Sequence, residues 1–350
     1  MLVFNLFCVV ALLLSYLATV ISPACIVFPA LFGLAYPYLL LLNILIVIMW
    51  VVRLRFEAFI SVAAIIIGIN HFSNYIKLSK PKGDKSGSFK VMSYNVHLFN
   101  LYESKEMKSS ENEIMNFLKE QDADIICLQE VFIVGDIAAK ERSMIASLGG
   151  KYSSHLKTLR HRRNRASGIM ILTKYPIVER GEVFYPESAS LTIYADILID
   201  KDTFRVYNNH LQSYSLGELE KTLLEEFIND DEKINKLKGL WGSLKNGFVK
   251  RALQAQALKE HVNASKYPVI VAGDFNDTPV SYSYRNIRNG LNDSFVNSGH
   301  GAGFTYRGNY PPNRIDYILY DKKITNNHFD IIKTKYSDHY PIMAWFKKND

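Results

Sequence analysis

The sequence has little cysteine, and it lacks the motifs of several common enzyme classes. Only three cysteines occur in 350 residues: Cys8 and Cys25 in the apolar N-terminal region, and Cys127 alone further on. They provide neither a disulfide framework nor a cysteine metal site. No HExxH, G-x-x-x-x-G-K-[ST], G-x-G-x-x-G or G-x-S-x-G motif is present. These absences argue against zinc peptidases, nucleotide-driven transferases, dinucleotide-dependent enzymes and serine hydrolases.

Charge is absent from the first part of the chain, where Arg53 is the first charged residue. A bilayer has a hydrocarbon layer of roughly 30 Å, which about 20 apolar residues can cross. The apolar runs 2–21, 22–52 and 58–70 therefore predict three transmembrane helices, and residues 1–76 are expected to form a membrane anchor. A cleaved signal peptide is disfavoured, because no basic residue precedes the first run and the apolar region is too long.

The basic residues near these runs decide the orientation expected across a membrane. Arg53 and Arg55 lie between the second and third runs, and a lysine-rich segment at 77–88 follows the third. Cytoplasmic loops carry an excess of Lys and Arg, but three spans cannot place both groups in the cytoplasm, and long domains translocate largely regardless of charge. We expect a multi-pass protein of the cell (inner) membrane, with 77–88 as a linker and the domain at 89–350 on the extracytoplasmic side.

Short apolar runs bounded by turn residues predict a strand-rich domain after the linker. Strands are expected at 89–94, 125–128, 168–172, 193–199, 204–207, 269–272, 315–319 and 342–346. Ser110 and Glu113 form a capping-box pattern, which predicts a helix after the first strand. Few helical stretches separate the strands, so the fold class is α/β (α+β), a layered sandwich of mixed sheets covered by helices rather than a doubly wound parallel sheet.

One long stretch of this domain does not follow the strand pattern. Between 213 and 266, apolar residues recur at helical spacing and predict two amphipathic helices. Either these helices pack on one face of the sandwich, or they form a lid or membrane-surface element that bears on substrate choice.

Several predicted strands end in polar side chains. In VIVAGDFNDTP an apolar run ends in Gly273, Asp274 and Asn276. Comparable positions at or near strand ends hold Asn95, Glu130, His210, Asp316, Asp338 and His339. Functional sites are assembled on loops at one rim of a rigid sheet, so the joint occurrence of these residues indicates a site. Their carboxylate and amide oxygens suit a hard cation such as Mg²⁺ or Mn²⁺.

The order of the motifs resembles that of one superfamily. MSYNVH, LQE, NNHLQS, GDFND, RIDYIL and SDHYPI follow one another from residue 92 onward, and together they are similar to the successive motifs of the endonuclease/exonuclease/phosphatase (DNase I-like) superfamily. The resemblance covers the range from 89 to the C-terminus. It implies a four-layer α/β sandwich of two packed mixed sheets flanked by helices, and hydrolysis of phosphoester bonds.

The same resemblance implies a role for each motif residue. Glu130 would be the principal ligand of Mg²⁺ or Mn²⁺, with Asn95 and Asp338 completing or flanking the metal site. Asp274 would orient or deprotonate the attacking water. Asn276 would hydrogen-bond the phosphoryl oxygens as charge builds on them.

Two histidines complete the implied site. His339 would contact the scissile phosphate and would be held in orientation by Asp316. His210 would stabilise the phosphate or help to protonate the leaving group. Abasic-site endonucleases of the superfamily carry Tyr at about the place of His210, so that activity is disfavoured.

Arginines offer further contacts for an anionic substrate. The run 160–165 holds four arginines beside the strand GIMIL, so Arg162, Arg163 and Arg165 are candidates to contact phosphate; the alternative is an ordinary solvated turn. Arg314, in RIDYIL, is a candidate for the same role.

Together these features predict a membrane-anchored, Mg²⁺-dependent phosphodiesterase of the nuclease type. The net charge of +7 is compatible with nucleic acid as the favoured substrate but does not identify it. The alternative is a phosphodiesterase of phospholipid or sphingomyelin, or an inositol-phosphate phosphatase, which a membrane anchor would suit. A second alternative is an inactive membrane scaffold. The lipid bilayer is the other expected partner, and no protein partner is inferred.

Overall fold

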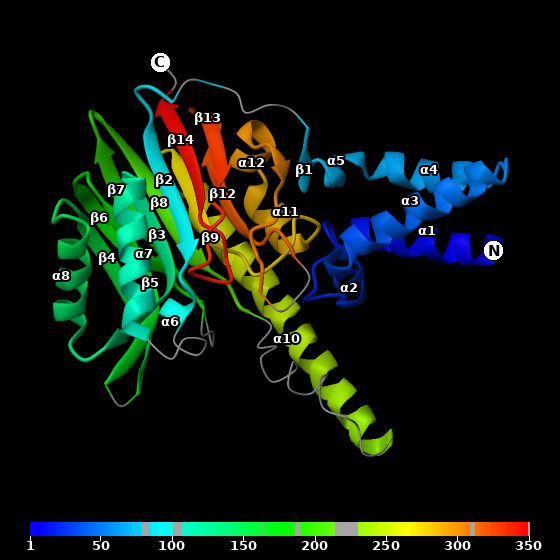
Figure 1. Ribbon diagram of the computed structural model, residues 1–350, viewed down its shortest axis with the longest axis horizontal. Coiled ribbons are helices and arrows are strands. Elements are labelled where there is room, and N and C mark those ends of the chain that lie inside the picture. Colours follow the sequence, from blue (N-terminus) through cyan, green and yellow to red (C-terminus); the bar gives the residue numbers. More distant parts are fainter. Residues whose placement is uncertain are drawn as a thin grey trace. The chain divides into compact units, whose positions relative to one another are not determined.

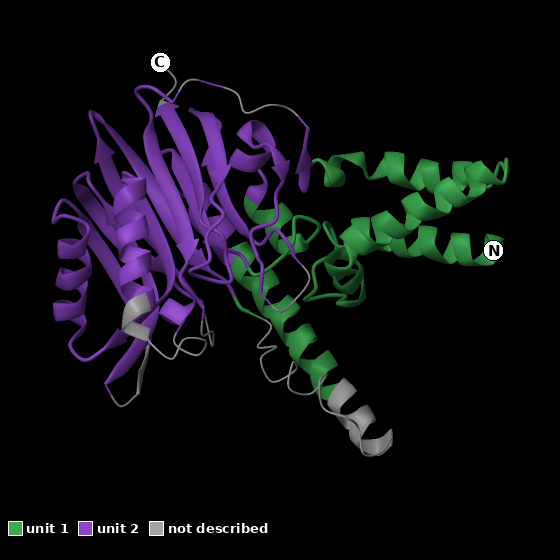
Figure 2. Cartoon of the chain, in the orientation of Figure 1, with its two compact units in different colours: residues 1–73, 212–256, 276–287 green, residues 74–211, 257–275, 288–350 purple. Residues whose placement is uncertain are grey.

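The chain forms two compact units (Figure 2). The computed structural model describes residues 1–78, 83, 85–100, 107–162, 164–185, 190–213, 230–308 and 312–348. The first unit, here called the helical unit, comprises residues 1–73, 212–256 and 276–287. The second, called the α/β unit, comprises 74–211, 257–275 and 288–350. The predicted boundary at 76/77 lies close to the end of the first segment, whereas two later segments of the predicted domain group with the N-terminal helices.

The helical unit begins with a series of short apolar helices. They are α1 (Leu2–Leu17), α2 (Phe28–Leu34), α3 (Tyr36–Val52), α4 (Ala58–Ile67) and α5 (Ile69–Phe72); most of α10 (Asp230–Asn263) and α11 (Tyr282–Arg288) also belongs to this unit. Among the described residues, no single helix is long and apolar enough to cross a membrane, although α2 and α3 meet that test as a pair bent by 69°. The prediction of three transmembrane helices is therefore not supported. Proline at the start of both α2 and α3 interrupts the run 22–52.

The interior of this helix group contains polar residues beside apolar ones such as Leu12 and Ile46. The Asn5 Oδ1 of α1 accepts a hydrogen bond from the Ser61 Oγ of α4 at 2.6 Å. The Asn43 Nδ2 of α3 donates to the carbonyl of Cys8 at 3.1 Å. Asn5, Asn43 and Ser61 are fully buried. The outward-facing residues are instead apolar: Val3, Phe7, Phe59 and Ile67 are between 68% and 81% exposed.

The α/β unit contains two mixed sheets of six strands each (Figure 1). The first has the order β13 (Ile324–Ile331), β14 (Ile342–Lys348), β2 (Phe89–Asn95), β3 (Ile125–Val134), β5 (Arg165–Thr173), β4 (Ser153–Arg162). The second has the order β10 (Leu291–Asp293), β12 (Asp316–Asp321), β9 (Val269–Asp274), β8 (Asp202–His210), β7 (Leu191–Ile199), β6 (Ile177–Val183). Each sheet has one parallel pair at its centre, β2–β3 in the first and β8–β9 in the second.

Alternation along the strands places one set of side chains between the sheets and the other set under helices. In the first sheet, Val91 and Cys127 belong to the core shared with the second sheet, as does Ile270 of β9. Their neighbours Met92 and Leu128 belong to a second core, which also contains residues of α7 (Met107–Gln121) and α8 (Ile137–Ser147). Figure 1 shows these two helices on the outer face of the first sheet.

Helical elements also contact the second sheet. The Tyr207 hydroxyl of β8 lies 2.9 Å from the Nδ1 of His261, in the last turn of α10, and Phe295 of α12 (Ser294–Ser298) belongs to the core between the sheets. The predicted sandwich of two packed mixed sheets flanked by helices is confirmed. A short ribbon of β1 (Ile76–Lys77) and β11 (Gly301–Ala302) completes the described strands. Of the two helices expected between 213 and 266, the structure forms α10, and residues 214–229 lie outside the described part.

Candidate active site

The two parallel strand pairs deliver polar residues to the same end of the sandwich. Asn95 is the last residue of β2 and pairs with Gln129 of β3. Glu130 follows Gln129 in β3. His210 ends β8 directly opposite Asp274, the last residue of β9. Parallel neighbours have their carboxyl ends at one edge, so each pair places two polar side chains there. The side-chain contacts described below join the two sheets at this rim.

A β-bulge presents the carboxylate of Glu130. The β3–β5 register shifts between Leu128 and Val131, and Glu130 adopts a φ of 55°. Asn208 of the second sheet satisfies the backbone opened by the bulge, since its Nδ2 donates to the carbonyls of Leu128 and Met170, each at 2.9 Å. Bulges next to functional sites redirect a side chain in this way, and buried amide bonds hold this one in place.

Gly273 allows β9 to approach β8 closely before Asp274. Its φ is 137°, a value that residues with a side chain rarely adopt. A Cβ at this position would clash with the backbone of Asn209. This is why the apolar run VIVA ends in glycine: the backbone contact sets the position of the carboxylate that follows.

Asn95 joins the carboxylates of the two sheets. Its Nδ2 donates to Asp274 Oδ2 at 3.0 Å and to Glu130 Oε1 at 3.3 Å. Asn95 and Asp274 are each 1% exposed, whereas Glu130 is half-buried and open to solvent on one side. Two carboxylates held this close require positive partners, and two histidines supply them.

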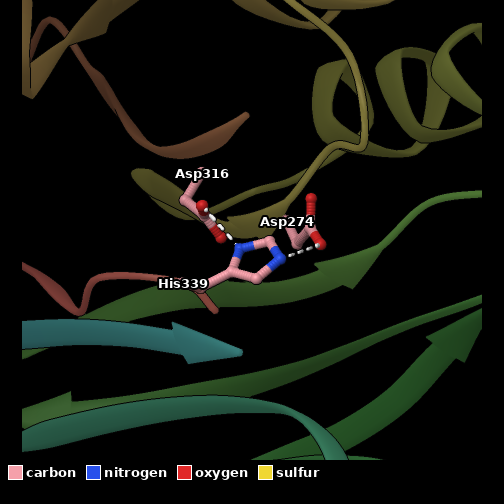
Figure 3. Close-up of side chains that lie close together, drawn as sticks. All are labelled: Asp274, Asp316 and His339. Atoms are coloured by element: carbon pink, nitrogen blue, oxygen red, sulfur yellow. Dashed lines mark hydrogen bonds and ion pairs between the residues drawn. The ribbon is translucent and has the colours of Figure 1, made fainter. Parts of the chain in front are cut away.

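His339 lies between two carboxylates (Figure 3). Its Nδ1 is 2.9 Å from Asp316 Oδ2, and its Nε2 is 3.8 Å from Asp274 Oδ2. Burial alone would lower the pKa of His339, but the charges of Asp316 and Asp274 and the hydrogen bond to Asp316 raise that pKa to about 10. Without a further cation nearby, His339 is therefore an imidazolium at neutral pH.

His210 forms the second histidine contact of the site. Its Nε2 lies 3.4 Å from Glu130 Oε1 and 4.0 Å from Asp274 Oδ2. Burial would lower the pKa of His210, but the hydrogen bond and charge of Glu130 outweigh burial and raise it. Burial would likewise raise the pKa of Glu130, yet the hydrogen bond and charge of His210 bring it down to about 2. Glu130 is thus a carboxylate throughout the physiological range.

The donor atoms at this rim fit a divalent cation. Asp274, Asp316 and His339 offer ligand atoms within 4.8 Å of one another, a spacing that can hold a metal ion. Because His339 Nδ1 already faces Asp316, the carboxylate oxygens of Asp274 and Glu130 are the better hard donors. The Nδ2 of Asn95 hydrogen-bonds to both carboxylates and so offsets part of the repulsion between them, which a bound cation would offset further.

Asp338 is tied to this group through its neighbours. The Ser337 hydroxyl donates to the carbonyl of Asn95 at 2.8 Å and lies 3.3 Å from Asp338 Oδ1. The Nδ1 of His97 lies 3.4 Å from the same carboxylate oxygen, and the backbone N–H of His97 donates to Asn95 Oδ1 at 3.0 Å. His97 and Ser337 were not among the predicted site residues. They lie within the motifs MSYNVH and SDHYPI, and this position in the sequence could have identified them as site residues.

Arg314 corrects one prediction. Its side chain is 1% exposed, and its Nη2 donates to both carboxylate oxygens of Asp293 at 2.6 Å. Its Nη1 donates to the carbonyl of Asn74 at 2.9 Å, and the guanidinium lies 4.6 Å from the ring centre of Phe295. A buried guanidinium with these partners is a structural group of the α/β unit, and it is not presented to a substrate.

The remaining predicted residues lie at the edges of the described structure. Arg163 and the side chain of Arg162 fall outside the described residues, so their role as phosphate contacts stays a prediction. Arg165 is exposed at the first position of β5. Asn276 has a φ of 51°, is half-buried and begins the segment 276–287 of the helical unit. Asp277, in the same segment, has its Oδ2 3.2 Å from the Nε of Arg251, a structural contact within that unit.

Comparison with known families identifies the class of protein. The family model of the Endonuclease/Exonuclease/phosphatase family matches residues 92–339, which is more than half of the chain and contains the described rim. The chain belongs to this family, whose members are hydrolases of phosphoester bonds. A domain of unknown function (DUF8431) matches residues 1–75, the N-terminal helices. No curated protein matches the sequence.

Solved structures share the fold. An endonuclease/exonuclease/phosphatase family protein from Leptotrichia buccalis C-1013-b is 16% identical, with a TM-score of 0.54, and the match covers 74% of this chain and 99% of that one. The human Nocturnin catalytic domain with bound sulfate anion is 16% identical, with a TM-score of 0.55 and coverage of 80% and 99%. A humanized D. rerio TDP2 is 15% identical, with a TM-score of 0.53 and coverage of 75% and 100%. At these identities the similarity concerns the fold alone.

Proposed function

We propose that the rim formed by Asn95, Glu130, Asp274 and His339 hydrolyses a phosphodiester bond with the help of Mg²⁺, or of Mn²⁺ in its place. The observation that carries this proposal is the contact of Asn95 with two carboxylates from different sheets, at 3.0 and 3.3 Å, beside a histidine of raised pKa. Hydrolysis of a phosphate ester requires charge neutralisation around phosphorus, a positioned water and a proton for the leaving oxygen. The residues at this rim are suited to all three tasks.

Each residue has a defined task in this proposal. Glu130, Asn95 and Asp338 would hold the cation, which supplies Lewis-acid polarisation of the phosphoryl group. Asp274 accepts a hydrogen bond from the attacking water, orients it and takes up its proton as the bond to phosphorus forms. The imidazolium of His339, held by Asp316, donates to a phosphoryl oxygen. His210, whose pKa is raised beside Glu130, provides the proton for the leaving group, while Asn276 donates to the phosphoryl oxygens.

A nucleic-acid phosphodiester is the proposed substrate. A phosphodiester of this kind presents the anionic group for which the rim supplies cations, and the basic run 160–165 with Arg165 would add contacts to neighbouring phosphates. A phospholipid or inositol-phosphate substrate is the second candidate, and the apolar surface of the N-terminal helices favours it.

We further propose that the helical unit anchors the protein in a lipid bilayer. Fully buried Asn5, Asn43 and Ser61 bond to one another or to backbone inside α1, α3 and α4, while Val3 and Phe7 are exposed. Helix groups in lipid associate through small and polar residues and face the hydrocarbon with apolar ones. The proposed location is the cell (inner) membrane, with the α/β unit on the extracytoplasmic side. A C-terminal fusion to a reporter that is active only outside the cytoplasm should be active, and an inactive fusion contradicts this side.

The test of the chemistry uses the full chain in detergent micelles. Hydrolysis of plasmid DNA, RNA, sphingomyelin, inositol phosphates and bis(p-nitrophenyl) phosphate is measured with Mg²⁺, with Mn²⁺ and with EDTA. We expect cleavage of nucleic acid that EDTA abolishes. Asp274→Asn and His339→Ala should each lower the rate by a factor of about 10² to 10⁴.

Three results would contradict parts of this assignment. Cleavage that survives Asp274→Asn or His339→Ala would show that the rim is not the catalytic site. Activity on sphingomyelin or inositol phosphates, with none on DNA or RNA, would replace the nucleic-acid substrate. Failure to hydrolyse any of these esters, while folding is intact, would favour an inactive scaffold.

A further inference from the structure

A cleft of about 520 Å³ lies next to the proposed catalytic rim in the α/β unit, and no role described so far uses it. Three cations line it: Arg307, Lys333 and Lys335. All three are exposed to solvent, and none of the described lining residues is acidic. Pockets for small ligands have volumes of about 300 to 1,000 Å³, so this cleft has the size of a ligand subsite.

Aromatic rings form the other part of the lining. Phe117 of α7 and Tyr336 lie with ring centres 6.1 Å apart, and both pack with the hydrophobic cluster on the outer face of the first sheet. This packing makes them a rigid floor. The third ring, Tyr340, is half-buried and lies 5.8 Å from the guanidinium of Arg307.

Backbone hydrogen bonds join the cleft to the catalytic rim. Arg307 donates its backbone N–H to the carbonyl of Asp338 at 2.8 Å, and Tyr340 donates to the carbonyl of Thr305 at 2.7 Å. Tyr306 forms a bridge with His339, and their rings meet edge to face at 5.2 Å. The segment that carries Arg307 is therefore fastened to the segment that carries His339 and Tyr340, so a ligand in the cleft would be held close to the reacting phosphate.

The combination of cations and aromatic faces distinguishes between ligand classes. An inositol phosphate or a lipid head group offers phosphates but no flat aromatic ring. A nucleotide offers both, because its phosphate pairs with Lys and Arg while its base stacks on an aromatic side chain. The guanidinium of Arg307 donates to the carbonyl of Thr334 at 3.1 Å, which orients it over the cleft.

We propose that this cleft binds the nucleotide adjacent to the scissile phosphate of a polynucleotide. Its phosphate would pair with Lys333, Lys335 and Arg307, and its base would stack on Tyr336 or Tyr340. The proposal rests on the phosphodiesterase function proposed above, and it specifies the substrate class of that same site.

The test measures binding without turnover. The full chain in detergent micelles is titrated against a fluorescein-labelled oligothymidylate in EDTA, and the anisotropy is followed at several salt concentrations. The double variant Lys333→Ala/Lys335→Ala should weaken binding about tenfold and reduce the salt slope by about 1.4, since each Lys–phosphate contact on a single strand contributes about 0.7. Tyr340→Ala should weaken binding about fivefold or more through lost stacking.

A matched control comes from the other end of β9. Lys266 is exposed and lies 5.0 Å from the ring of Tyr267, so it has a similar cation–ring contact, but it precedes the strand that Asp274 ends. Lys266→Ala and Tyr267→Ala should leave oligonucleotide binding unchanged. Competition with the dinucleotide pTpT should displace the label at lower concentration than competition with inositol trisphosphate.

Two results would overturn the cleft proposal: wild-type affinity and salt slope in the Lys333→Ala/Lys335→Ala variant, or stronger competition by inositol trisphosphate than by pTpT. Hydrolysis separates this outcome from failure of the proposed function. A wild-type protein that hydrolyses bis(p-nitrophenyl) phosphate, which has no neighbouring nucleotide, but binds oligonucleotide independently of Lys333 and Lys335 would keep the function and contradict the cleft. A wild-type protein that binds oligonucleotide through the cleft but hydrolyses no ester would contradict the function and support the cleft.

Discussion

The helical unit and the α/β unit differ in how many large apolar side chains they expose. In the α/β unit, side chains such as Ile193, Val206 and Ile270 fill the space between the sheets and are fully buried. In the helical unit, the fully buried side chains include Asn5 and Asn43, while large apolar side chains face outward. The first pattern is that of a protein domain folded in water. The second is typical of helices that associate in lipid, where apolar burial offers no driving force.

The difference also assigns different work to the two units. The titratable groups with the largest functional consequences, Glu130 and His339, lie at the rim of the α/β unit, where a rigid apolar core fixes the strands that carry them. Inside α1, α3 and α4 the buried polar groups include the uncharged amides and hydroxyl of Asn5, Asn43 and Ser61, which hydrogen-bond to one another or to the backbone. We therefore expect the α/β unit to carry the chemistry and the helical unit to carry the attachment.

The largest expected effect tests whether the chemistry lies at the α/β rim. Asp316→Asn removes the charge that holds His339, and we expect kcat to fall by a factor of about 10² to 10⁴, because an imidazole without its carboxylate loses orientation and its imidazolium loses stabilisation. The matched control is Asp330→Asn, since Asp330 lies 2.8 Å from His328 but is partly exposed. Steady-state kinetics with Mg²⁺ decide the question, and equal losses in both variants would contradict the assignment.

A polar substitution in the α/β core comes next. Ile270→Asn leaves a gap and an amide without partners in a fully buried position, so the unit should lose about 4 kcal/mol of stability. Thermal unfolding followed by circular dichroism should show a clear drop in Tm. If the variant unfolds at the wild-type temperature, the space between the sheets is not the core that we describe.

The outward face of the helical unit can be tested by charge. Phe7→Lys together with Phe59→Lys places two ammonium groups on the apolar surface, and each costs about 3 kcal/mol at the centre of a bilayer. The fraction of protein that sediments with membranes should fall. Val178→Lys is the control, because Val178 is also 60% exposed but belongs to β6 of the α/β unit. If the double variant stays in the membrane fraction after alkaline extraction, Phe7 and Phe59 do not face lipid.

The smallest expected effect concerns the buried amide of Asn43 in the helical unit. Asn43→Leu removes hydrogen bonds to the carbonyls of Cys8 and Leu39 and places an apolar residue inside the helical unit. Bonds between helices in lipid contribute on the order of 0.6 kcal/mol, so the shift in Tm in detergent should be far smaller than that of Ile270→Asn. If Asn43→Leu lowers the Tm as much as Ile270→Asn does, the two interiors respond alike to a change of polarity.

Much of the α/β unit could be predicted from local patterns. Apolar runs bounded by turn residues mark strands because half of each strand must be buried, and the runs at 89–94, 125–128 and 269–272 fall within β2, β3 and β9. The polar residues at the ends of these strands could also be recognised, because they follow directly on apolar runs. What the patterns could not provide was pairing: Asn95 and Asp274 are 179 residues apart in the chain, yet they share a hydrogen bond.

Other predictions failed or remained open because they depended on neighbours that are distant in sequence. Arg314 is a cation in a motif, and only the fold reveals that Asp293 and Asn74 surround it. Hydropathy measures average composition, so it combined α2 and α3 into one span although a proline starts each helix.

The sequence alone predicted the strands β2, β3, β5, β7, β8, β9, β12 and β14, but not β4, β6, β10 or β13. It also indicated the polar residues at strand ends and the apolar character of the first helices. These are properties of local periodicity and composition. The tertiary structure alone shows that Asn208 secures the bulge of Glu130, that Asp316 and Asp274 face the two nitrogens of His339, and that Asn5, Asn43 and Ser61 are buried among the helices of the helical unit. Such contacts depend on which surfaces the folded chain brings together, and neither spacing nor residue type records that.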